Sequence, residues 1–514
     1  MGARVGLSFL NLARANHKMA ENGEMKLPFS FARRFGVLAV AGEAGTCVLY
    51  CRKDAEAAAL QEARRFLGRV VAAKVVEAAE YDRRLRELYE AGPGSDLETV
   101  EIDEDLDLDN LAASIAGAQE ILENDEHAPV IRLMNGLLAR AVRMGASDIH
   151  IEPFEKVLRV RFRIDGVLRT MLEPQLALAP LLAARIKVMS RLDIAEKRLP
   201  QDGRISILIA GRPVDVRVST IPAAMGERVV LRILDKQDGR LDLEQLGMEG
   251  EVLAGFNTLL GRADGIVLVT GPTGSGKTTT LYAALARLNK QSRNIMTVED
   301  PIEYHLEGIG QSQVNMKTGM TYAKGLRAIL RQDPDVVMVG EVRDIETAEI
   351  AVQASLTGHL VFSTLHTSTA VGALTRLRDM GVESYLLSSS LAGVLAQRLV
   401  RRLCPECKRP RPVSKSEAAS IATRLGGRNL DTVWEAAGCP TCDGQGYHGR
   451  IGIFELLILD DELREMVHQG ASEQLIAGHQ ARRSILDAGI DKVAGGETSL
   501  VELLRVLGGT SEVG

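Results

Sequence analysis

A glycine-rich loop between an apolar run and an amphipathic run constrains the fold of this chain more than any other feature. Residues 271–278 read Gly-Pro-Thr-Gly-Ser-Gly-Lys-Thr and fit the pattern G-x-x-x-x-G-K-[ST]. The run GIVLVT at 265–270 precedes the loop and is typical of a fully buried parallel strand. The run TTLYAALARL at 279–288 follows the loop and has helical spacing. A strand, a phosphate-binding loop and a helix in this order predict an α/β fold of the P-loop class.

The residues of the loop indicate how a nucleotide is bound. Glycine lacks a Cβ, so backbone N–H groups can approach phosphate oxygens at the N-terminus of the helix. Lys277 adds positive charge at the β- and γ-phosphates, and Thr278 offers a hydroxyl to Mg²⁺. The predicted nucleotide-binding residues are Gly271, Pro272, Thr273, Gly274, Ser275, Gly276, Lys277, Thr278 and Thr279.

Three further motifs follow the loop. The run DVVMVGE at 335–341 predicts a buried strand beside the P-loop strand, with Glu341 as the carboxylate carried to the metal; an ordinary exposed strand-end acid is the alternative. The acidic box TVEDPIEY at 297–304 gathers three carboxylates beside a proline and would alone be an unremarkable turn. His359 and His366 flank another apolar strand, where lone histidines are more often structural.

The length of the chain argues for about three folded domains, because 514 residues are available at roughly 100–200 residues per domain. The runs FGVLAVAG and TCVLYC and the helical stretch after them predict a small α/β module over 1–90. Residues 129–238 predict an α+β domain, with a helix that ends at Gly145 and strands joined by a hairpin turn at Asp165-Gly166. The P-loop domain occupies 239–514.

Charge marks the boundary after the first module. The net charge is −6, but the stretch from 91 to 130 holds about a dozen acids and no Lys or Arg, which leaves the remainder near +6. We predict that 91–128 is a flexible, self-repelling linker. No apolar run approaches the ~18 residues that cross a bilayer, and the N-terminal segment is too polar for a signal peptide. We therefore expect a cytoplasmic protein.

Two CxxC pairs near the end of the chain predict a metal site. Their spacing is C-x₂-C-x₃₁-C-x₂-C, which can supply four thiolates to one structural zinc ion; a redox disulfide pair is the alternative. The predicted ligands are Cys404, Cys407, Cys439 and Cys442, in a subdomain over about 398–450. Cys47 and Cys51 have no further ligands near them in the sequence, so we expect buried free thiols.

Basic residues crowd the first CxxC pair and leave the class of partner open. Such a patch suits nucleic acid, anionic phospholipid or an acidic protein surface. The aromatic content of 4% and the negative net charge weigh against base stacking and a broad nucleic-acid surface. The patch consists of Arg398, Arg401, Arg402, Lys408, Arg409 and Arg411.

The ordered motifs together resemble the ATPase family that drives type II secretion and type IV pilus assembly. The resemblance rests on the P-loop, TVEDPIEY, DPDVVMVGEVRD and LTGHLVFSTLHT, and extends back to about Ile131 through GASDIHIEP, LPQDGR and RVSTIPAAMGERVVLRIL. It implies a RecA-like P-loop NTPase core, preceded by a smaller α+β PAS-like domain and the N-terminal α/β module. The short front end with LPFSFARRFGVL looks like that of a type II secretion ATPase.

This resemblance implies an activity and a set of partners. The activity is ATP hydrolysis that drives pseudopilus assembly and protein export; a pilus extension ATPase, a DNA-transfer or nucleic-acid-binding ATPase and a nucleotide-dependent scaffold with little turnover are the alternatives. The implied cofactors are ATP, Mg²⁺ and Zn²⁺. The implied assembly is a ring of six chains, peripheral at the inner membrane. Its implied partners are the cytoplasmic domain of an inner-membrane secretion protein, the membrane platform protein and anionic phospholipid, with no specific nucleic acid.

Family roles transfer to individual residues of this sequence. Glu299 would polarise the attacking water, and Glu341 would hold Mg²⁺ with Thr278. His366 would sense the γ-phosphate and His359 would support the site. Arg217 and Arg232 match arginines that neutralise phosphate charge when their domain closes; a solvated strand face is the alternative. Three other arginines would line the subunit interface: Arg327, Arg331 and Arg343.

Overall fold

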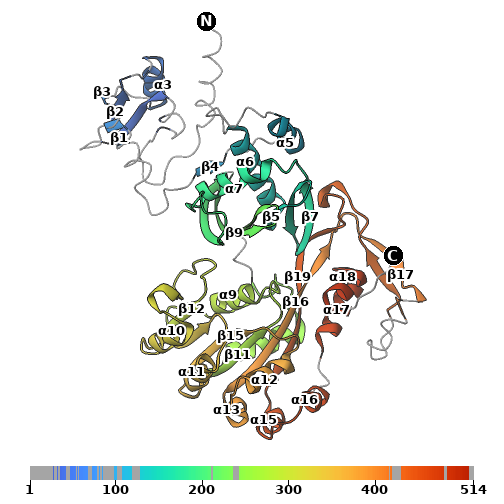
Figure 1. The fold of residues 1–514 in the computed structure, drawn as a ribbon. Helices are drawn as coiled ribbons and strands as arrows, with labels where there is room; N and C mark the ends of the chain where they lie inside the picture. Colours follow the sequence, from blue (N-terminus) through green and yellow to red (C-terminus); the bar gives the residue numbers. More distant parts are fainter. Residues whose placement is uncertain are drawn as a thin grey trace. The chain divides into compact units, whose positions relative to one another are not determined.

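The structure, a computed structural model, divides the chain into two compact units, Met1–Glu101 with Ser206–Pro213 and Ile102–Ile205 with Val214–Gly514 (Figure 1). The residues that it describes are 27, 32, 35–41, 47–53, 55, 57–67, 72–77, 80–81, 84, 98–100, 107–117, 128–209, 212–235, 242–415, 417–418, 430–479 and 483–508. The predicted interdomain segment at Asp238-Gly239 lies outside these residues.

The described part of the first unit contains a three-stranded sheet and helix α3 around a small core. Strand β1 (Val37–Ala41) pairs antiparallel with β2 (Cys47–Arg52), and β2 pairs in parallel with β3 (Ala72–Val76). Helix α3 (Ala57–Leu67) buries Ala59 and Ala63 against Val37 and Leu49. The strand predicted from TCVLYC is therefore confirmed.

Cys51 is a free thiol inside this small core, and its burial raises its pKa. That agrees with the expectation for Cys51. The side chain of Cys47 lies outside the described part of the chain.

The acidic segment predicted as a linker contains regular structure. Strand β4 (Glu98–Val100) pairs in parallel with residues 207–209 of β8 (Gln201–Ile209). Helix α5 (Leu108–Gly117) buries Leu108, Ala112 and Ile115. These apolar residues recur at helical spacing, so packing orders this part of an otherwise acidic stretch. Residues 101–106 and 118–127 lie outside the description.

An antiparallel sheet flanked by helices follows. Its strands in the second unit run in the order β9-β10-β5-β6-β7. Asp165 and Gly166, with φ of 49° and 81°, form the β6–β7 turn, as the sequence predicts. The elements are α6 (Ala128–Arg143), β5 (Ala146–Pro153), β6 (Leu158–Ile164), β7 (Val167–Leu172), α7 (Leu178–Met189), β9 (Arg212–Ala223) and β10 (Gly226–Asp235).

The two faces of this sheet differ because side chains alternate along each strand. On β5, Ile149 and Ile151 are buried in the apolar core, which also contains Leu133 of α6 and Ile186 of α7. Asp148, His150 and Glu152 lie on the opposite face, where Arg161 and Arg228 pair with Glu152.

The remainder of the second unit is built on a seven-stranded sheet in the order β13-β12-β14-β15-β11-β16-β19. The neighbouring strands are parallel except at β16–β19. The strands are β11 (Gly265–Thr270), β12 (Ile295–Glu299), β13 (Gly310–Gln313), β14 (Val336–Val339), β15 (Leu360–Leu365), β16 (Leu391–Leu403) and β19 (Tyr447–Ile458).

Helices cover both faces of this sheet. On β11, Val267 and Val269 belong to one core cluster with Leu285 of α9, whereas Ile266 and Leu268 belong to another with Leu326 of α10. The predicted buried parallel strand is confirmed at its predicted bounds. The helices are α8 (Gly250–Leu260), α9 (Lys277–Leu288), α10 (Tyr322–Ile329), α11 (Ile345–Leu356), α12 (Ala370–Asp379) and α13 (Ser384–Ser390).

The C-terminal part forms a further core cluster. Val400 of β16 and Ile451 and Ile453 of β19 are buried with Ile490 of α17 and Leu503 of α18. The elements are β17 (Arg409–Pro412), β18 (Thr432–Glu435), α15 (Asp461–His468), α16 (Glu473–His479), α17 (Ile485–Ala494) and α18 (Leu500–Val506). Within the described residues, no helix has the length and apolar character needed to cross a membrane.

Candidate nucleotide and metal sites

The P-loop joins the end of β11 to the start of α9 in a conformation that requires glycine. Gly274 and Gly276 have φ of 80° and 86°, a region that other residues rarely adopt. At Gly271 a Cβ would lie 2.5 Å from the carbonyl oxygen of Gln397, so a larger residue has no room. The loop therefore brings backbone N–H groups to the N-terminus of α9.

A cavity of about 370 Å³ opens over this loop. Lys277, Glu341 and His366 line it from three elements of the core, and Arg232 lines it from β10. The volume lies in the range of small-molecule sites. The loop residues on its wall are Thr273, Gly274, Ser275, Gly276, Lys277, Thr278 and Thr279.

The ammonium group of Lys277 is held at the mouth of the loop. Its Nζ donates to the carbonyl oxygens of Gly271 at 2.8 Å and Pro272 at 3.2 Å. Burial lowers its pKa, while the nearby Glu341 carboxylate acts in the opposite direction. Two backbone carbonyl groups of the loop thus position the Lys277 ammonium group.

His366 lies between the lysine and the acid. Its Nδ1 is 3.5 Å from Lys277 Nζ, and its Nε2 is 3.5 Å from a carboxylate oxygen of Glu341. His366 follows β15 and Glu341 follows β14, so the carboxyl ends of two parallel strands bring them together. The prediction from sequence is wrong on one point, because β14 does not adjoin the P-loop strand: β15 lies between β14 and β11.

The acidic box places its first glutamate, which is buried, on the wall of the cavity. Glu299 ends β12 and is 3% exposed. Its oxygens accept hydrogen bonds from Tyr282, from Thr297 at 2.5 Å and from Gln311 at 3.1 Å. Burial, together with the Glu299 carboxylate, raises the pKa of Tyr282. Three hydrogen-bond donors thus surround the Glu299 carboxylate, which was predicted from the sequence to polarise the attacking water.

Glu303, the third acid of the box, is more accessible. Its side chain is 37% exposed and lines the nucleotide cavity. It accepts a hydrogen bond from Arg217 Nη2 at 3.0 Å. Glu303 was not among the functional residues predicted from the sequence. Its place in the acidic box, four residues after Glu299, is a signal that could have identified it as one.

The two predicted arginines are direct cross-strand neighbours. Arg217 on β9 pairs in register with Arg232 on β10. Arg232 reaches the nucleotide cavity, and its Nε donates to Asp148 at 3.0 Å, whereas Arg217 bonds to the acidic box. Both arginines also line a second cavity of about 580 Å³ beside Asp300 and Pro301.

His359 does not belong to this site. It precedes β15, so it lies at the amino end of the strand whose carboxyl end leads to His366. Its Nδ1 is 2.9 Å from the carbonyl oxygen of Ala354 and 3.2 Å from Thr357 Oγ1. The expectation that His359 supports the nucleotide site is therefore wrong, because the full length of β15 separates the two histidines.

All three arginines assigned to a subunit interface have partners on their own chain. Arg327 pairs with Glu346 at 2.6 Å, and Arg343 pairs with Glu341. Arg331 Nη1 donates to the carbonyl oxygen of Arg327.

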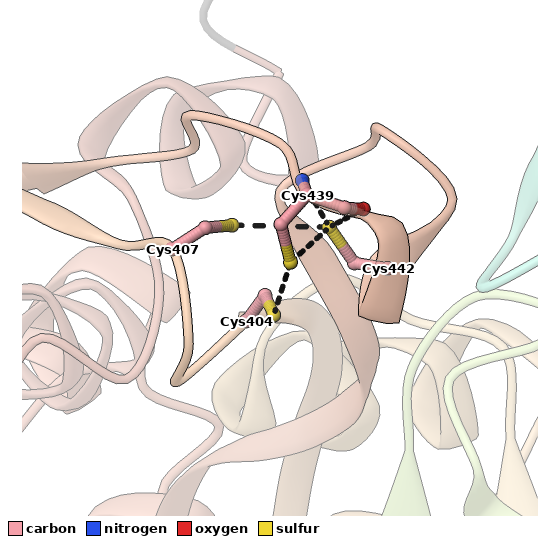
Figure 2. A group of neighbouring side chains, drawn as sticks. All are labelled: Cys404, Cys407, Cys439 and Cys442. Carbon is pink, nitrogen blue, oxygen red and sulfur yellow. Dashed lines mark hydrogen bonds between the residues drawn. The ribbon is translucent and has the colours of Figure 1, made fainter.

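Four cysteines form one cluster (Figure 2). Sγ–Sγ distances are 3.8 Å for Cys404–Cys439 and for Cys407–Cys442, and 3.7 Å for Cys439–Cys442. All four sulfurs lie within 4.8 Å of one another. None is in a disulfide, so the redox pair is not formed.

The spacing fits a tetrahedral zinc ion. With Zn–S bonds of about 2.3 Å, tetrahedral geometry separates the sulfurs by about 3.8 Å. Gly438, with φ of 88°, makes the tight turn before the second pair. Burial opposes the Cys442 thiolate, but the N–H groups of Cys439 and Gly446 donate to its sulfur and lower its pKa to about 6. Such donors favour the charged form that binds metal.

Two of the six residues in the basic patch beside the first pair are neutralised by carboxylates of the chain. Arg401 pairs with the buried Glu502 at 2.9 Å, and Arg411 pairs with Glu417 and Glu435. Lys408 donates to the carbonyl oxygen of Gly496 and lies over the ring of Trp434. Since Glu502 lies about a hundred residues after Arg401, the basic run alone overstates the charge that these two arginines offer to an external ligand.

Sequence comparisons match almost the whole chain. The family described as "Type II/IV secretion system protein" matches residues 123–505, and a second model, which describes a domain of "GSPII protein E", matches residues 26–89. The chain is 54% identical to "Type II secretion system protein E" of Aeromonas hydrophila, over 94% of this chain and 96% of the relative. It is 53% identical to "Type II secretion system ATPase E" of Vibrio cholerae, with the same coverage.

Solved structures resemble the fold. The ATPase DotB of Yersinia pseudotuberculosis matches with a TM-score of 0.56 at 19% identity, over 80% of this chain and 99% of that structure. DotB of Legionella pneumophila matches with a TM-score of 0.55 at 21% identity, over 73% and 95%. The predicted P-loop core is thus confirmed at the level of the fold.

Proposed function

The chain belongs to the type II/IV secretion system protein family, among relatives named type II secretion system protein E, and on that premise we propose that it is the ATPase motor of a type II secretion system. The motor hydrolyses ATP and uses the work to assemble a pseudopilus and export proteins across the outer membrane. The observation that carries this proposal is the convergence of Lys277, His366, Glu341 and Arg232 on one cavity above the P-loop.

These residues take roles that follow from their charge and position. Lys277 and the loop N–H groups bind the β- and γ-phosphates, and His366 contacts the γ-phosphate from the end of β15. Thr278 and Glu341 would hold Mg²⁺, which neutralises phosphate charge when bound. Arg232 and Arg217 meet the negative charge that develops on the transferred phosphoryl group, a contact that can contribute about 10³–10⁵ in rate.

The two glutamates of the acidic box divide the work. Both glutamates line the cavity, but Glu303 is the more exposed of the two, so it is the better placed to orient and deprotonate the attacking water once Arg217 leaves it. Glu299 accepts hydrogen bonds from Tyr282 of α9 and from Gln311 of β13, so it fixes the box against the P-loop helix. This differs from the assignment made from the sequence, in which Glu299 acts on water.

The zinc ion supplies structure rather than chemistry. The four thiolates leave no open coordination position for a substrate. Cys404, Cys407, Cys439 and Cys442 would hold the ion and join the loop after β16 to the loop before β19.

The proposed setting is a ring of six chains on the cytoplasmic side of the inner membrane. The N-terminal module, which matches a domain of GSPII protein E, docks on the cytoplasmic domain of an inner-membrane secretion protein. The membrane platform protein and anionic phospholipid are further candidate partners. A pilus extension motor is the second candidate, because the ordered motifs of this chain also resemble those of the ATPases of type IV pilus assembly.

The test is complementation of a type II secretion mutant. A strain that lacks its own secretion ATPase but carries the remaining components should regain export when it expresses this chain, and should not regain it with Lys277→Ala. ATP hydrolysis by the purified chain should be unchanged by DNA. Recovery of pilus extension without recovery of export would favour the second candidate, and DNA-stimulated hydrolysis would favour a DNA-transfer ATPase.

A further inference from the structure

The two arginines near the nucleotide cavity are anchored in different ways. Arg217 donates to the acidic box, on Glu303 Oε2 and on the carbonyl oxygen of Ile302. Arg232 donates to Asp148, a residue of its own sheet. When the sheet moves relative to the core, Arg217 must exchange its partner, whereas the partner of Arg232 moves with it.

Asp148 is built into the sheet directly beside Arg232. The two residues are register partners on the antiparallel strands β5 and β10. The Asp148 side chain is 7% exposed, while that of Arg232 is 59% exposed. The acid therefore forms the base from which the arginine extends toward solvent and the cavity.

The hydrogen bonds of Arg232 leave its terminal guanidinium nitrogens available to a ligand. Only Nε of Arg232 bonds to Asp148, through Oδ1 at 3.0 Å. The terminal nitrogens of Arg232 bond to no other residue in the described part of the chain. A guanidinium offers five N–H donors, so the four on the terminal nitrogens remain for phosphate oxygens.

Asp148 is itself held by its second oxygen. Ser147 Oγ donates to Asp148 Oδ2 at 2.8 Å, and Arg163 Nε lies 3.6 Å from the same oxygen. One carboxylate oxygen is thus anchored in the sheet and the other orients the arginine. Such support restricts the rotamers of a long side chain before the reaction begins.

We propose that Asp148 is a positioning residue for ATP hydrolysis, which orients Arg232 through its Nε so that the terminal nitrogens meet the transferred phosphoryl group. This rests on the charge-neutralising role given to Arg232 in the proposed function. Asp148 acts only through Arg232 and makes no contact with nucleotide. Its loss therefore lowers kcat and leaves nucleotide affinity unchanged.

A double-mutant cycle on the full-length chain tests this role. Steady-state kcat, Kd for a fluorescent ATP analogue and the melting temperature are measured for Asp148→Ala, Arg232→Ala and the double variant. Asp148→Ala should lower kcat about tenfold, which corresponds to ~1.4 kcal/mol of activation free energy. The same change in the Arg232→Ala background should have no further effect, because the positioned group is gone. Asp148→Asn should restore most of the rate, since its amide oxygen can still accept from Nε.

Two further variants keep the test decisive. Glu173→Ala is the matched control, because Glu173 also accepts from an arginine Nε, that of Arg159, at 2.5 Å and lies away from the cavity; its kcat should be that of wild type. If Asp148→Ala does not fold, Ser147→Ala releases the anchor of Asp148 with a smaller change, and should lower kcat about threefold only when Arg232 is present.

The outcomes separate this proposal from the one on which it rests. Arg232→Ala with wild-type kcat would remove the role of Arg232 and the positioning role together. A large loss of kcat in Arg232→Ala, with Asp148→Ala and Ser147→Ala both at wild-type kcat, would overturn the positioning role alone. Full additivity of the two substitutions would also overturn it, because Asp148 would then act independently of Arg232.

Discussion

Glu303 Oε2 accepts a hydrogen bond from Arg217 Nη2 at 3.0 Å, so an acid of the nucleotide cavity and an arginine of the preceding sheet neutralise each other. If both groups serve hydrolysis, they must first separate, because the arginine is needed at phosphate and the acid at water. Nucleotide phosphates compete with Glu303 for the same guanidinium. When Arg217 binds a phosphate group, Glu303 therefore becomes free to contact water.

Lys277→Ala should abolish ATP hydrolysis. The substitution removes the cation that Gly271 and Pro272 hold at the phosphate site, so charge on the β- and γ-phosphates is no longer balanced. The measurement is steady-state phosphate release at saturating ATP. Lys290→Ala, at an exposed position after the same helix, is the control and should hydrolyse ATP like wild type. Hydrolysis at the wild-type rate by Lys277→Ala would exclude this site.

Glu303→Gln should retain ATP binding and lose turnover, because an amide cannot accept the proton of water. Glu299→Gln should lower the melting temperature as well as turnover, since its new N–H₂ group would face donors from Thr297 and Gln311. A buried polar mismatch of this kind costs ~1–3 kcal/mol. Measurements of kcat, ATP affinity and melting temperature for both variants distinguish a catalytic role of Glu303 from a structural role of Glu299.

The opposite pattern would restore the assignment made from sequence. A Glu299→Gln variant with wild-type melting temperature and no turnover, beside an active Glu303→Gln variant, would place Glu299 at the water.

Glu341→Gln should reduce hydrolysis through weaker Mg²⁺ handling, and raising the Mg²⁺ concentration should recover part of the rate.

Cys404→Ser or Cys439→Ser should lose zinc and destabilise the segment from 404 to 442. Apparent zinc binding free energies of ~10–16 kcal/mol contribute directly to folding in small sites of this type. Elemental analysis should find one zinc ion per wild-type chain, and a strong chelator should lower the melting temperature. Cys51→Ala changes a cysteine of the N-terminal module and should keep the metal. Full stability and activity in zinc-free protein would contradict a structural zinc ion.

If hydrolysis belongs to the proposed ring rather than to a single chain, specific activity should rise with protein concentration. A ring would hold the sheet that carries Arg217 and Arg232 over the nucleotide, and mass action favours the ring at higher concentration. Acidic vesicles or the membrane partner should increase activity further. Constant specific activity over a hundredfold dilution of a species shown by light scattering to be monomeric would contradict this.

Stability of the C-terminal part should fall in acid through Glu502. Burial favours its neutral form, but hydrogen bonds from Arg505 and Arg401 outweigh burial and hold the pKa of Glu502 below its usual range. Because the folded pKa is the lower one, the stabilisation is complete above the unfolded value of about 4.3 and is lost as pH falls through the folded value. Glu502→Gln should lose roughly 3 kcal/mol at pH 7, and this loss should shrink as pH falls through the folded pKa. A difference in melting temperature that stays constant with pH would contradict this.

Elements whose information is local could be predicted from the amino-acid sequence. The run GIVLVT, the loop and the helix after it have the predicted order because burial, glycine conformations and helical spacing are set by neighbouring residues. The turn at Asp165-Gly166 was predictable for the same reason. The spacing of the four cysteines predicted one cluster because each CxxC turn presents two sulfurs to the same side.

Which of these groups work together depends on the tertiary structure. The order of strands places β15 beside β14, which brings His366 to Glu341, while the length of β15 separates His359 from the site. Both Glu299 and Glu303 line the cavity, but packing and hydrogen bonds from other elements bury Glu299, whereas Glu303 stays more exposed. Arg401 meets Glu502, a partner about a hundred residues away, so its charge is neutralised inside the fold. Such contacts depend on strand order and long-range packing, which local spacing does not encode.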